Sequence, residues 1–491
     1  MKVFRYIALA LLASVLGVSM ASAQSWTNVT ASPQAIGPIL QLRDGRILAH
    51  SDQNGNANSW YILSPASDGT YETGTWAGPY NMQSGYAPFF FSSVVMLDGK
   101  TVLAEGGEYN NGQSVWTTLG SLGTVTPFGG MTWVANSPPT GWSTIGDAES
   151  DLMANGKYLQ SNCCTKQTAF YNGPNSWIAG PNVLAVRNDE SGYTSLPDGR
   201  VLMVDVQTNS NCGNSTKSSE VLDANGVAWT CGPQLTQQLW QQSDQELGSA
   251  VLFYPSSKYP KGGVFQMGGN AVASNILDFN TFTWATGPTL SNYDQADGPG
   301  ALEPNGKVLE MISPGLFNAG CTFAEFDPIA GTLTATANNS QCPSSSSYEG
   351  HMMIFPTGQI GSLSFETQIH LYKGTGSPVS GVAATIIPVA NVVLGGSKNN
   401  KLYGFQLNGL SENNAYGDDY QMATNYPLIR FKDSSGKVWY GFTHDDSSHS
   451  IAPNTLSYTL YDLNPAMPPG SYTMQTVTNG IGSNIVNIHV R

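Results

Sequence analysis

Two of the six histidines in this 491-residue chain, His444 and His449, flank Asp445 and Asp446 in the stretch GFTHDDSSHS. Imidazole nitrogens and carboxylate oxygens ligate metals, and the same side chains also form turns in polar loops. The stretch therefore predicts either part of a metal site or an ordinary polar loop. The choice between them depends on which other ligands fold against it.

A second set of candidate residues consists of acids that stand shortly before apolar segments: Asp147 and Glu149, Asp189 and Glu190, Asp244 and Glu246, Asp294 and Asp297, and Glu349. If the segments that follow are strands around one axis, these acids gather at one end of the axis. Clustered carboxylates raise one another's pKa values or bind a cation, which makes such a cluster a candidate functional site. The alternative is that they accept hydrogen bonds from backbone N–H groups and water at the strand starts.

The elements that would position these acids are visible as a repeat. Seven similar glycine turns lie between apolar runs, at Gly45, Gly99, Gly156, Gly199, Gly262, Gly306 and Gly358, and five of them are Asp-Gly or Asn-Gly. Such turns are a strong hairpin signal, and their long period is typical of propeller blades. In each of the first six repeats a later strand carries a large apolar residue at a corresponding position: Trp76, Trp133, Trp177, Trp229, Trp284 and Leu333. The seventh repeat lacks one, and Trp26 near the N-terminus supplies it. The sequence thus predicts an all-β chain with a seven-bladed β-propeller closed by its N-terminal strand.

The predicted domain organisation has three parts. Residues 1–23 have the charged start, apolar run and small-residue end of a secretory signal peptide. Residues 24–377 form the propeller. After a Gly/Ser/Pro-rich linker, residues 378–491 contain short alternating segments typical of an immunoglobulin-like β-sandwich. The mature protein is expected outside the cytoplasm, secreted or periplasmic.

Composition narrows the range of partners. Charged residues make up 11% of the chain and the net charge is −14. So acidic a chain, with so few cations, is a poor partner for nucleic acid or an anionic membrane, and no segment past the signal is long enough to span a bilayer. The expected state is a soluble monomer.

Six cysteines in an exported chain suggest disulfides, with Cys212–Cys231 and Cys321–Cys342 as local pairs. The adjacent Cys163 and Cys164 form either a small disulfide ring or a buried thiol pair.

The repeats, the closing N-terminal strand, the C-terminal YGFTHDDSS and the tail PPGSYTMQTVTNGIGSNIVNIHV together resemble the galactose oxidase and glyoxal oxidase family of secreted copper enzymes. The resemblance covers essentially the whole mature chain. It implies that His444 supplies a metal ligand from the C-terminal domain and that Tyr348 supplies another from the last blade. Glu349 then stands where the family has a second histidine.

The resemblance also implies a loss. The family's tyrosine that is cross-linked to cysteine falls at Asp147, and the cysteine falls near Ser92, so the tyrosyl radical cofactor cannot form. The expected replacement is one metal ion, with Cu, Mn, Fe, Zn or Ca as candidates, held by His444, Tyr348, Glu349 and Asp147.

The function expected from these residues is recognition or conversion of a carbohydrate or polyol at the propeller mouth. Asp147, Glu149 and Glu190 are the candidate acid–base groups, and Cys163, Cys164, Trp142 and Tyr109 are the candidate substrate contacts. Two alternatives stay open. One is a metal-free glycoside hydrolase that uses two of the axial carboxylates, and the other is a binding module without chemistry.

Overall fold

The computed structural model describes residues 24–52, 57–269, 271–387, 391–415 and 423–491. These residues form β-strands and two short 3-10 helices, η1 (Ser210–Cys212) and η2 (Ser347–Glu349). In the described part of the chain no helix is long and apolar enough to cross a membrane. The expected signal peptide, residues 1–23, lies outside the described residues.

Within the described residues, seven antiparallel sheets are built on four strands each, and we number them ring sheets 1 to 7 in chain order. From first to fourth strand they are β2 (Ile36–Gln41), β3 (Ile47–Ser51), β4 (Ser59–Ser64), β5 (Thr75–Asn81); β7 (Ser92–Val95), β8 (Thr101–Glu105), β11 (Gly120–Val125), β12 (Met131–Asn136); β13 (Ser150–Leu152), β14 (Tyr158–Ser161), β15 (Thr168–Tyr171), β16 (Trp177–Ala179); β17 (Tyr193–Ser195), β18 (Val201–Val204), β19 (Ser219–Leu222), β20 (Trp229–Cys231); β21 (Leu247–Phe253), β22 (Gly263–Gly268), β23 (Ser274–Asp278), β24 (Thr283–Thr286); β25 (Gly300–Leu302), β26 (Val308–Ile312), β27 (Thr322–Asp327), β28 (Thr332–Ala335); and β29 (His351–Ile354), β30 (Ile360–Leu363), β31 (His370–Lys373), β1 (Ser25–Asn28).

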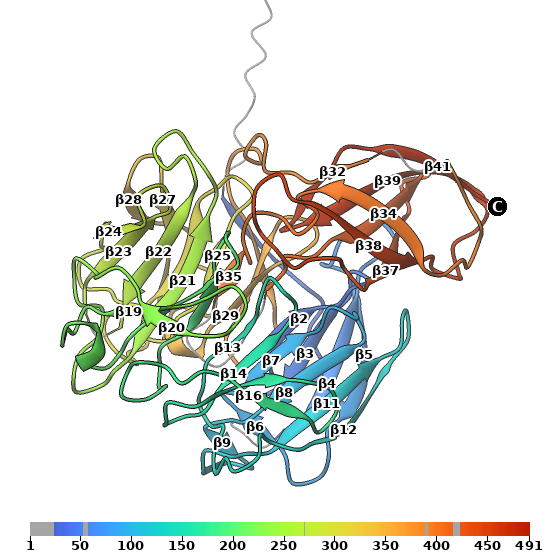
Figure 1. Cartoon of the computed structure of the whole chain (residues 1–491). Coiled ribbons are helices and arrows are strands. Elements are labelled where there is room, and N and C mark those ends of the chain that lie inside the picture. Colours follow the sequence, from blue (N-terminus) through green and yellow to red (C-terminus); the bar gives the residue numbers. More distant parts are fainter. Residues whose placement is uncertain (1–23, 53–56, 270, 388–390, 416–422) are drawn as a thin grey trace, which may run out of the picture.

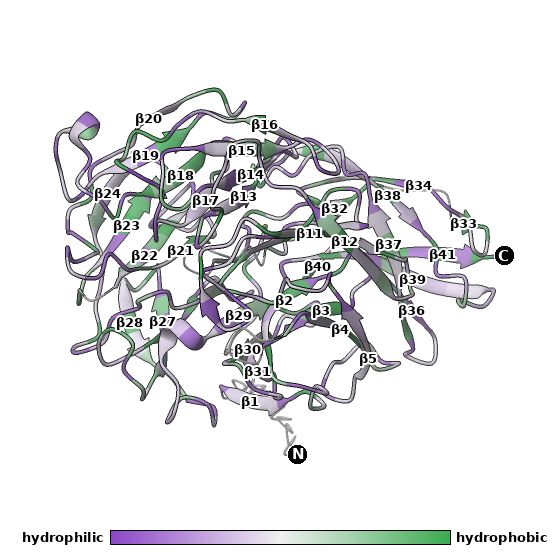
Figure 2. Ribbon diagram, turned by 90° about the horizontal axis from the view of Figure 1, so that it is seen from below, coloured by the Kyte–Doolittle hydropathy of each residue, from purple (hydrophilic) through white to green (hydrophobic). Residues whose placement is uncertain are grey.

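The first strands of these sheets close a circle. Each lies against the first strands of the neighbouring sheets, and β29 of ring sheet 7 lies against β2 of ring sheet 1. The result is a propeller-like ring, seen from below in Figure 2. All first strands run in the same direction relative to the ring axis. Residues before them therefore gather at one end, here called the mouth, and the hairpin turns after them gather at the other, here called the turn end.

The predicted turn and strand markers occupy the expected places. The seven turn glycines all have positive φ, between 70° and 90°, a conformation that glycine adopts without strain. The predicted tryptophans and Leu333 lie on the fourth strands, and Trp26 lies on β1, which pairs with β31. The chain's N-terminal strand thus completes ring sheet 7 and removes an exposed sheet edge.

Apolar side chains between neighbouring ring sheets form most of the core. Trp60 and Trp133 stack with centroids 5.2 Å apart between ring sheets 1 and 2, and Phe265 and Phe326 stack at 4.0 Å between ring sheets 5 and 6. The disulfides Cys212–Cys231 and Cys321–Cys342 are formed as predicted. A small sheet joins β6 (Pro88–Phe89), which precedes β7, to β9 (Tyr109–Asn110) and β10 (Gln113–Ser114), which lie between β8 and β11.

The C-terminal strands form a separate lobe that packs beside the ring (Figure 1). Its strands follow the order β32-β34-β38-β37-β36-β39-β41-β33, and β40 pairs with β39. Their bounds are β32 (Thr385–Ile386), β33 (Val392–Val393), β34 (Asn400–Phe405), β36 (Leu428–Asp433), β37 (Val438–His444), β38 (Leu456–Asp462), β39 (Gly470–Thr478), β40 (Ile481–Gly482) and β41 (Val486–Val490). We call it the C-terminal lobe.

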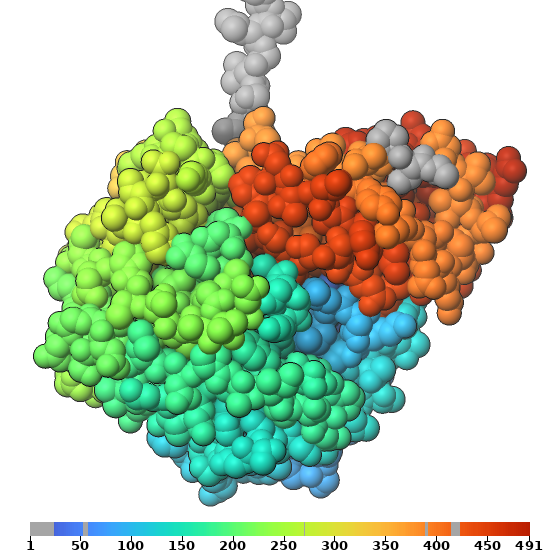
Figure 3. Space-filling model, in the orientation of Figure 1, coloured from blue at the N-terminus to red at the C-terminus, as the bar shows by residue number. Residues whose placement is uncertain are grey.

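The C-terminal lobe lies against the ring in the space-filling view (Figure 3), and its backbone hydrogen bonds reach residues of the turn end. Thr443 donates its backbone N–H to the Arg43 carbonyl at 3.0 Å, and Val438 donates to Ser67 at 2.8 Å. One segment of the lobe also lies along the inside of the ring. There β35 (Asn414–Ala415) pairs with β25, and the Glu412 carboxylate accepts a hydrogen bond from the Ser195 backbone at 3.0 Å.

Candidate functional site

Three carboxylates from three ring sheets converge at the mouth. Glu190, Glu246 and Asp297 precede β17, β21 and β25, and each offers an oxygen within 4.8 Å of the oxygens of the other two. Glu190 and Asp297 have φ of 56° and 45°, a left-handed conformation that is costly for residues other than glycine. We call these three residues the carboxylate triad.

Hydrogen bonds between neighbouring ring sheets hold the loops that carry the triad. The Asp297 backbone N–H donates to the Leu247 carbonyl at 2.8 Å. Arg187 contacts Asp189 at 2.5 Å and donates to the Gln245 side chain at 2.8 Å, which links the loop of Glu190 to that of Glu246. The carboxylates are therefore brought together by the fold itself.

Two further acids of the mouth have raised pKa values. Burial raises the pKa of Asp294 to about 6, and only one backbone hydrogen bond, from Ala296, opposes this effect. Burial also raises the pKa of Asp189, although the neighbouring Arg187 guanidinium favours its charged form. A carboxyl that titrates near pH 6 can donate a proton at near-neutral pH.

Glu149, predicted as an acid–base group, is fully buried at the start of ring sheet 3. One of its oxygens accepts a hydrogen bond from the Ser191 backbone at 3.2 Å. Glu149 also lies near Tyr193 and helps to raise the pKa of that hydroxyl, after burial itself. It therefore tethers two neighbouring mouth loops.

Cys163 and Cys164 form a disulfide between adjacent residues at the mouth end of β14. Asp189 Oδ1 lies 3.4 Å from Cys164 Sγ and 3.6 Å from Cys163 Sγ, and since disulfide sulfurs carry no hydrogen these are packing contacts. Cys163 is fully buried and Cys164 is partly exposed. The disulfide thus presents one apolar edge beside Asp189.

Trp116, which no sequence motif indicated, adjoins this disulfide. A Cβ placed on Gly146 would lie 3.3 Å from both Cys163 Cβ and Trp116 Cβ, so the three residues are neighbours. Trp116 is 44% exposed and has a φ of 41°. One sequence feature could have indicated Trp116 as a functional residue: it is not the tryptophan on the fourth strand of its repeat, which is Trp133.

The predicted contacts Tyr109 and Trp142 are both half-buried. Burial raises the pKa of Tyr109, with smaller contributions from nearby Glu108, Asp147 and Tyr348. Asp147, Tyr109 and Tyr348 therefore lie in one neighbourhood of the mouth. Trp142 is two residues from Thr144, whose hydroxyl donates to the Cys163 carbonyl.

Glu349 has a local structural partner. Tyr348 and Glu349 lie in η2, where the Glu349 carboxylate accepts a hydrogen bond from the Ser346 backbone at 2.9 Å and completes a capping box. The Tyr348 ring packs at 5.0 Å from Phe317. This arrangement favours the alternative reading of Glu349, in which an acid at a strand start satisfies a backbone N–H.

The expected ligand set of His444, Tyr348, Glu349 and Asp147 is wrong, because His444 lies at the turn end. Its neighbour Asp445 donates its backbone N–H to the Leu97 carbonyl in the hairpin turn that follows β7. Ala148, next to Asp147, accepts from the Ser92 hydroxyl at the start of β7. The three residue steps of β7 from Ser92 to Val95 span about 10 Å, and Leu97 lies beyond them in the turn. One metal ion cannot contact both His444 and Asp147.

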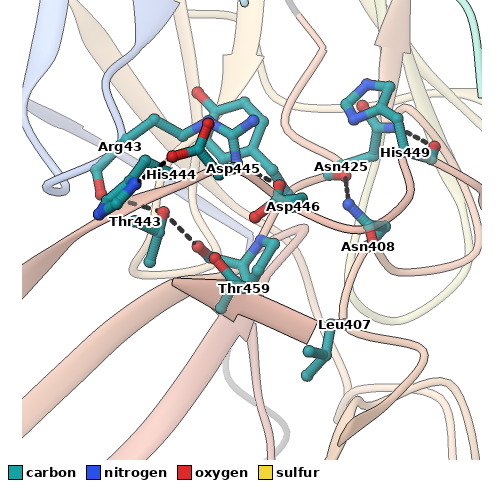
Figure 4. Close-up of polar contacts among 12 residues, drawn as sticks. Arg43, Leu407, Asn408, Asn425, Thr443, His444, Asp445, Asp446, His449 and Thr459 are labelled. Atoms are coloured by element: carbon teal, nitrogen blue, oxygen red, sulfur yellow. Dashed lines mark hydrogen bonds and ion pairs between the residues drawn. The ribbon is translucent and has the colours of Figure 1, made fainter. Parts of the chain in front are cut away.

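The surroundings of His444 are shown in Figure 4. Its Nδ1 lies 2.7 Å from Asp445 Oδ2 and its Nε2 lies 3.4 Å from Asp462 Oδ1, so carboxylates face both ring nitrogens. Asp446 pairs with Arg43 at 2.6 Å, and His449 is buried against the ring. GFTHDDSSHS is therefore a polar junction between the lobe and the ring.

The remaining histidines do not complete a nitrogen-rich site at the mouth. His351 begins β29 but is fully buried, and burial lowers its pKa to about 3. His50 lies on the second strand of ring sheet 1, His370 on β31 and His489 on β41. The donor atoms of the triad are carboxylate oxygens. This donor set does not fit the copper centre that the resemblance implied, which needs imidazole nitrogens.

The ring, the closing N-terminal strand and the acidic mouth define a propeller-like all-β protein. No protein-family model and no curated protein matches the sequence. Among solved structures, the chain is similar to one described as a novel fungal alcohol oxidase of the AA5 family in complex with copper. That alignment has a TM-score of 0.53 and 13% identity, and covers 96% of this chain and 100% of the other.

Two other solved structures align with less of the chain. A streptogramin B lyase aligns over 72% of this chain and 98% of its own, with 11% identity and a TM-score of 0.47. A virginiamycin B lyase from Staphylococcus aureus aligns over 72% and 99%, with 10% identity and a TM-score of 0.45. At these identities the likeness to the oxidase concerns the fold alone.

Proposed function

We propose that this chain is a secreted protein that binds a carbohydrate or polyol at the ring mouth, beside one hard divalent cation held by the carboxylate triad. In this proposal residues 24–377 are a seven-bladed propeller and residues 378–491 an immunoglobulin-like sandwich. The observation that carries it is the convergence of Glu190, Glu246 and Asp297 from three ring sheets. The three disulfides support an oxidising compartment.

The chemistry of the donors selects the class of ion. Ca²⁺, Mn²⁺ and Mg²⁺ prefer oxygen ligands, whereas copper prefers nitrogen and sulfur. Such an ion, when bound, would attract substrate hydroxyl or carbonyl oxygens and polarise them. Asp147 and Ser92 stand where the copper family has its cross-linked tyrosine and cysteine, so we propose no radical oxidation.

The surroundings of the triad suit a sugar. Trp116 and the Cys163–Cys164 disulfide supply apolar surface for the C–H face of a pyranose ring, and Arg187 and Asp189 supply a donor and an acceptor for hydroxyls. These residues lie on the loops next to the triad. Glu149 links two of these loops through the Ser191 backbone, and Asp147 lies near Tyr109 at the same rim.

A second candidate function rests on Asp294. Its pKa of about 6 suits a general acid, and Asp297 or Glu246 would serve as the ionised partner. This pairing describes a metal-free glycoside hydrolase. A metal-free hydrolase should hydrolyse its glycoside in the presence of a chelator, whereas the metal-dependent hypothesis predicts that a chelator abolishes function.

The first test is metal content and calcium or manganese titration by calorimetry on the full mature chain. About one ion per chain is expected, with at least tenfold weaker binding in Glu246→Gln and Asp297→Asn. Asp244→Asn is the matched control, because Asp244 precedes β21, as Glu246 does, but is not part of the triad. Unchanged ion binding in both triad variants would refute the metal site. A glycan array with and without chelator then separates metal-dependent binding, hydrolysis and no recognition.

A further inference from the structure

The pocket at the turn end between ring sheets 4 and 5 is distinct from the mouth. It has a volume of about 240 Å³ and is lined by Leu196, Pro197, Asp198, Arg200, Lys261, Phe279, Phe282 and Pro453. The first four residues belong to the hairpin turn of ring sheet 4, the next three to turns of ring sheet 5, and Pro453 to the C-terminal lobe. We call it the junction pocket. Ligand sites are common where two structural units meet.

The base of the junction pocket is aromatic and apolar. Phe279 and Phe282 are partly buried and pack against the core shared by ring sheets 4 and 5, and Leu196 is almost fully buried. Phe282 has a φ of 53°, so its ring is held by a backbone conformation that is rare for phenylalanine. These side chains form a wall that suits a flat apolar ring.

Its rim is cationic in an otherwise acidic protein. Arg200 lies over the Phe282 ring with its guanidinium carbon 4.3 Å from the centroid. Asp198 pairs with Arg200 at 2.7 Å, and Lys261 is an exposed second cation. The three charges sum to +1. One anionic group on the ligand therefore matches the rim, whereas a dianion or a cation does not.

The equivalent groove one sheet further on differs in these respects. It is lined by serines, Asn305, Asp327 and Lys307 among others, and Lys307 is paired with Glu325 at 2.8 Å. It offers neither the two phenylalanines nor an unmatched positive charge. Of these two grooves, the junction pocket is the one that combines an aromatic wall with a cationic rim.

We infer that the junction pocket binds a small organic monoanion with an aromatic ring, such as an aromatic carboxylate, with the ring against Phe279 and Phe282 and the carboxylate at Lys261 and Arg200. The volume suits one ring and one carboxylate group. This site is independent of the proposed function of the mouth, because it lies at the opposite end of the first strands.

The test uses benzoate as the probe, with benzamide as its neutral isostere and acetate as its charge without a ring. Binding to the full mature chain is measured by ligand-observed NMR titration at low ionic strength. Benzoate is expected to bind saturably and at least fivefold more tightly than either comparison compound. Lys261→Gln should reduce benzoate affinity to that of benzamide, and Lys261→Arg should restore most of it.

Lys258→Gln is the matched control, since Lys258 is a nearby lysine outside the junction pocket and should leave the affinity unchanged. Equal binding of benzoate and benzamide, no saturable binding at all, or an equal loss in the Lys258 and Lys261 variants would each overturn the inference. Lys261 is exposed, so its substitution leaves folding intact, which circular dichroism verifies. Mouth variants such as Glu246→Gln should bind benzoate normally.

Discussion

Arg43 in the first hairpin turn of the ring and Asp446 in the C-terminal lobe form an ion pair of 2.6 Å in which both side chains are almost completely buried. The Arg43 guanidinium also lies 3.9 Å from the centroid of the Tyr426 ring. The pair joins residues that are 403 positions apart in the sequence. It makes the junction between lobe and ring part of the folded core.

Removal of one partner of this pair should destabilise the protein strongly. Asp446→Asn leaves the Arg43 charge buried without its counter-ion, which costs about 3–5 kcal/mol. Urea unfolding monitored by fluorescence should show this loss. The exposed pair Arg200–Asp198 is the comparison, and Arg200→Gln should cost less than about 1 kcal/mol. Equal losses in the two variants would contradict the role assigned to Arg43 and Asp446.

Three buried histidines should make the protein sensitive to acid. Burial lowers the pKa values of His50, His351 and His449 from 6.5 to about 3. Since the unfolded chain binds these protons first, the contribution of these histidines to stability is full above pH 6.5 and falls by about 1.4 kcal/mol per histidine and pH unit towards pH 3. His449→Gln should reduce this slope by about one proton. His489→Gln, at an exposed position, should not change the slope.

Glu310 should act in the opposite direction. Burial raises its pKa from 4.5 to about 8, and the Gln295 amide donates to it at 2.6 Å. The folded state holds this proton, so the contribution is present below pH 4.5 and is lost as the pH rises through 8. By linkage the loss amounts to roughly 5 kcal/mol. Glu310→Gln should therefore flatten the decline in unfolding free energy between pH 5 and pH 8. An unchanged decline would show that Glu310 ionises freely in the folded state.

Trp116 should contribute to ligand affinity at the mouth. Stacking on an exposed aromatic ring is worth about 0.5–1.5 kcal/mol, so Trp116→Ala should weaken sugar binding about two- to tenfold. The melting temperature should change little, because the ring is 44% exposed. Val115→Ala, at the neighbouring exposed residue, is the control. A melting temperature that falls with unchanged affinity would assign Trp116 to packing.

Much of the fold could be predicted because local patterns encode it. Turn glycines such as Gly45 and Gly358 need positive φ, and a tryptophan on six of the seven fourth strands marks the repeat. Strand direction then places residues that precede first strands at one end of the ring. This is why the convergence of acids such as Glu190, Glu246 and Asp297 could be foreseen from their positions alone.

The site itself depended on tertiary structure. The loop conformations of Glu190 and Asp297 decide which three acids meet. The Glu349 carboxylate instead accepts a hydrogen bond at the start of its own helix, η2. Trp116 and the Cys163–Cys164 disulfide both lie against Gly146. No local sequence pattern indicated this contact. The position of His444 followed from the packing of the lobe on the turn end of the ring. The strands, the hairpin turns and the local disulfides Cys212–Cys231 and Cys321–Cys342 could be predicted because they rest on short-range geometry. The set of polar side chains that share a site could not, because it depends on contacts between segments that are far apart in the sequence.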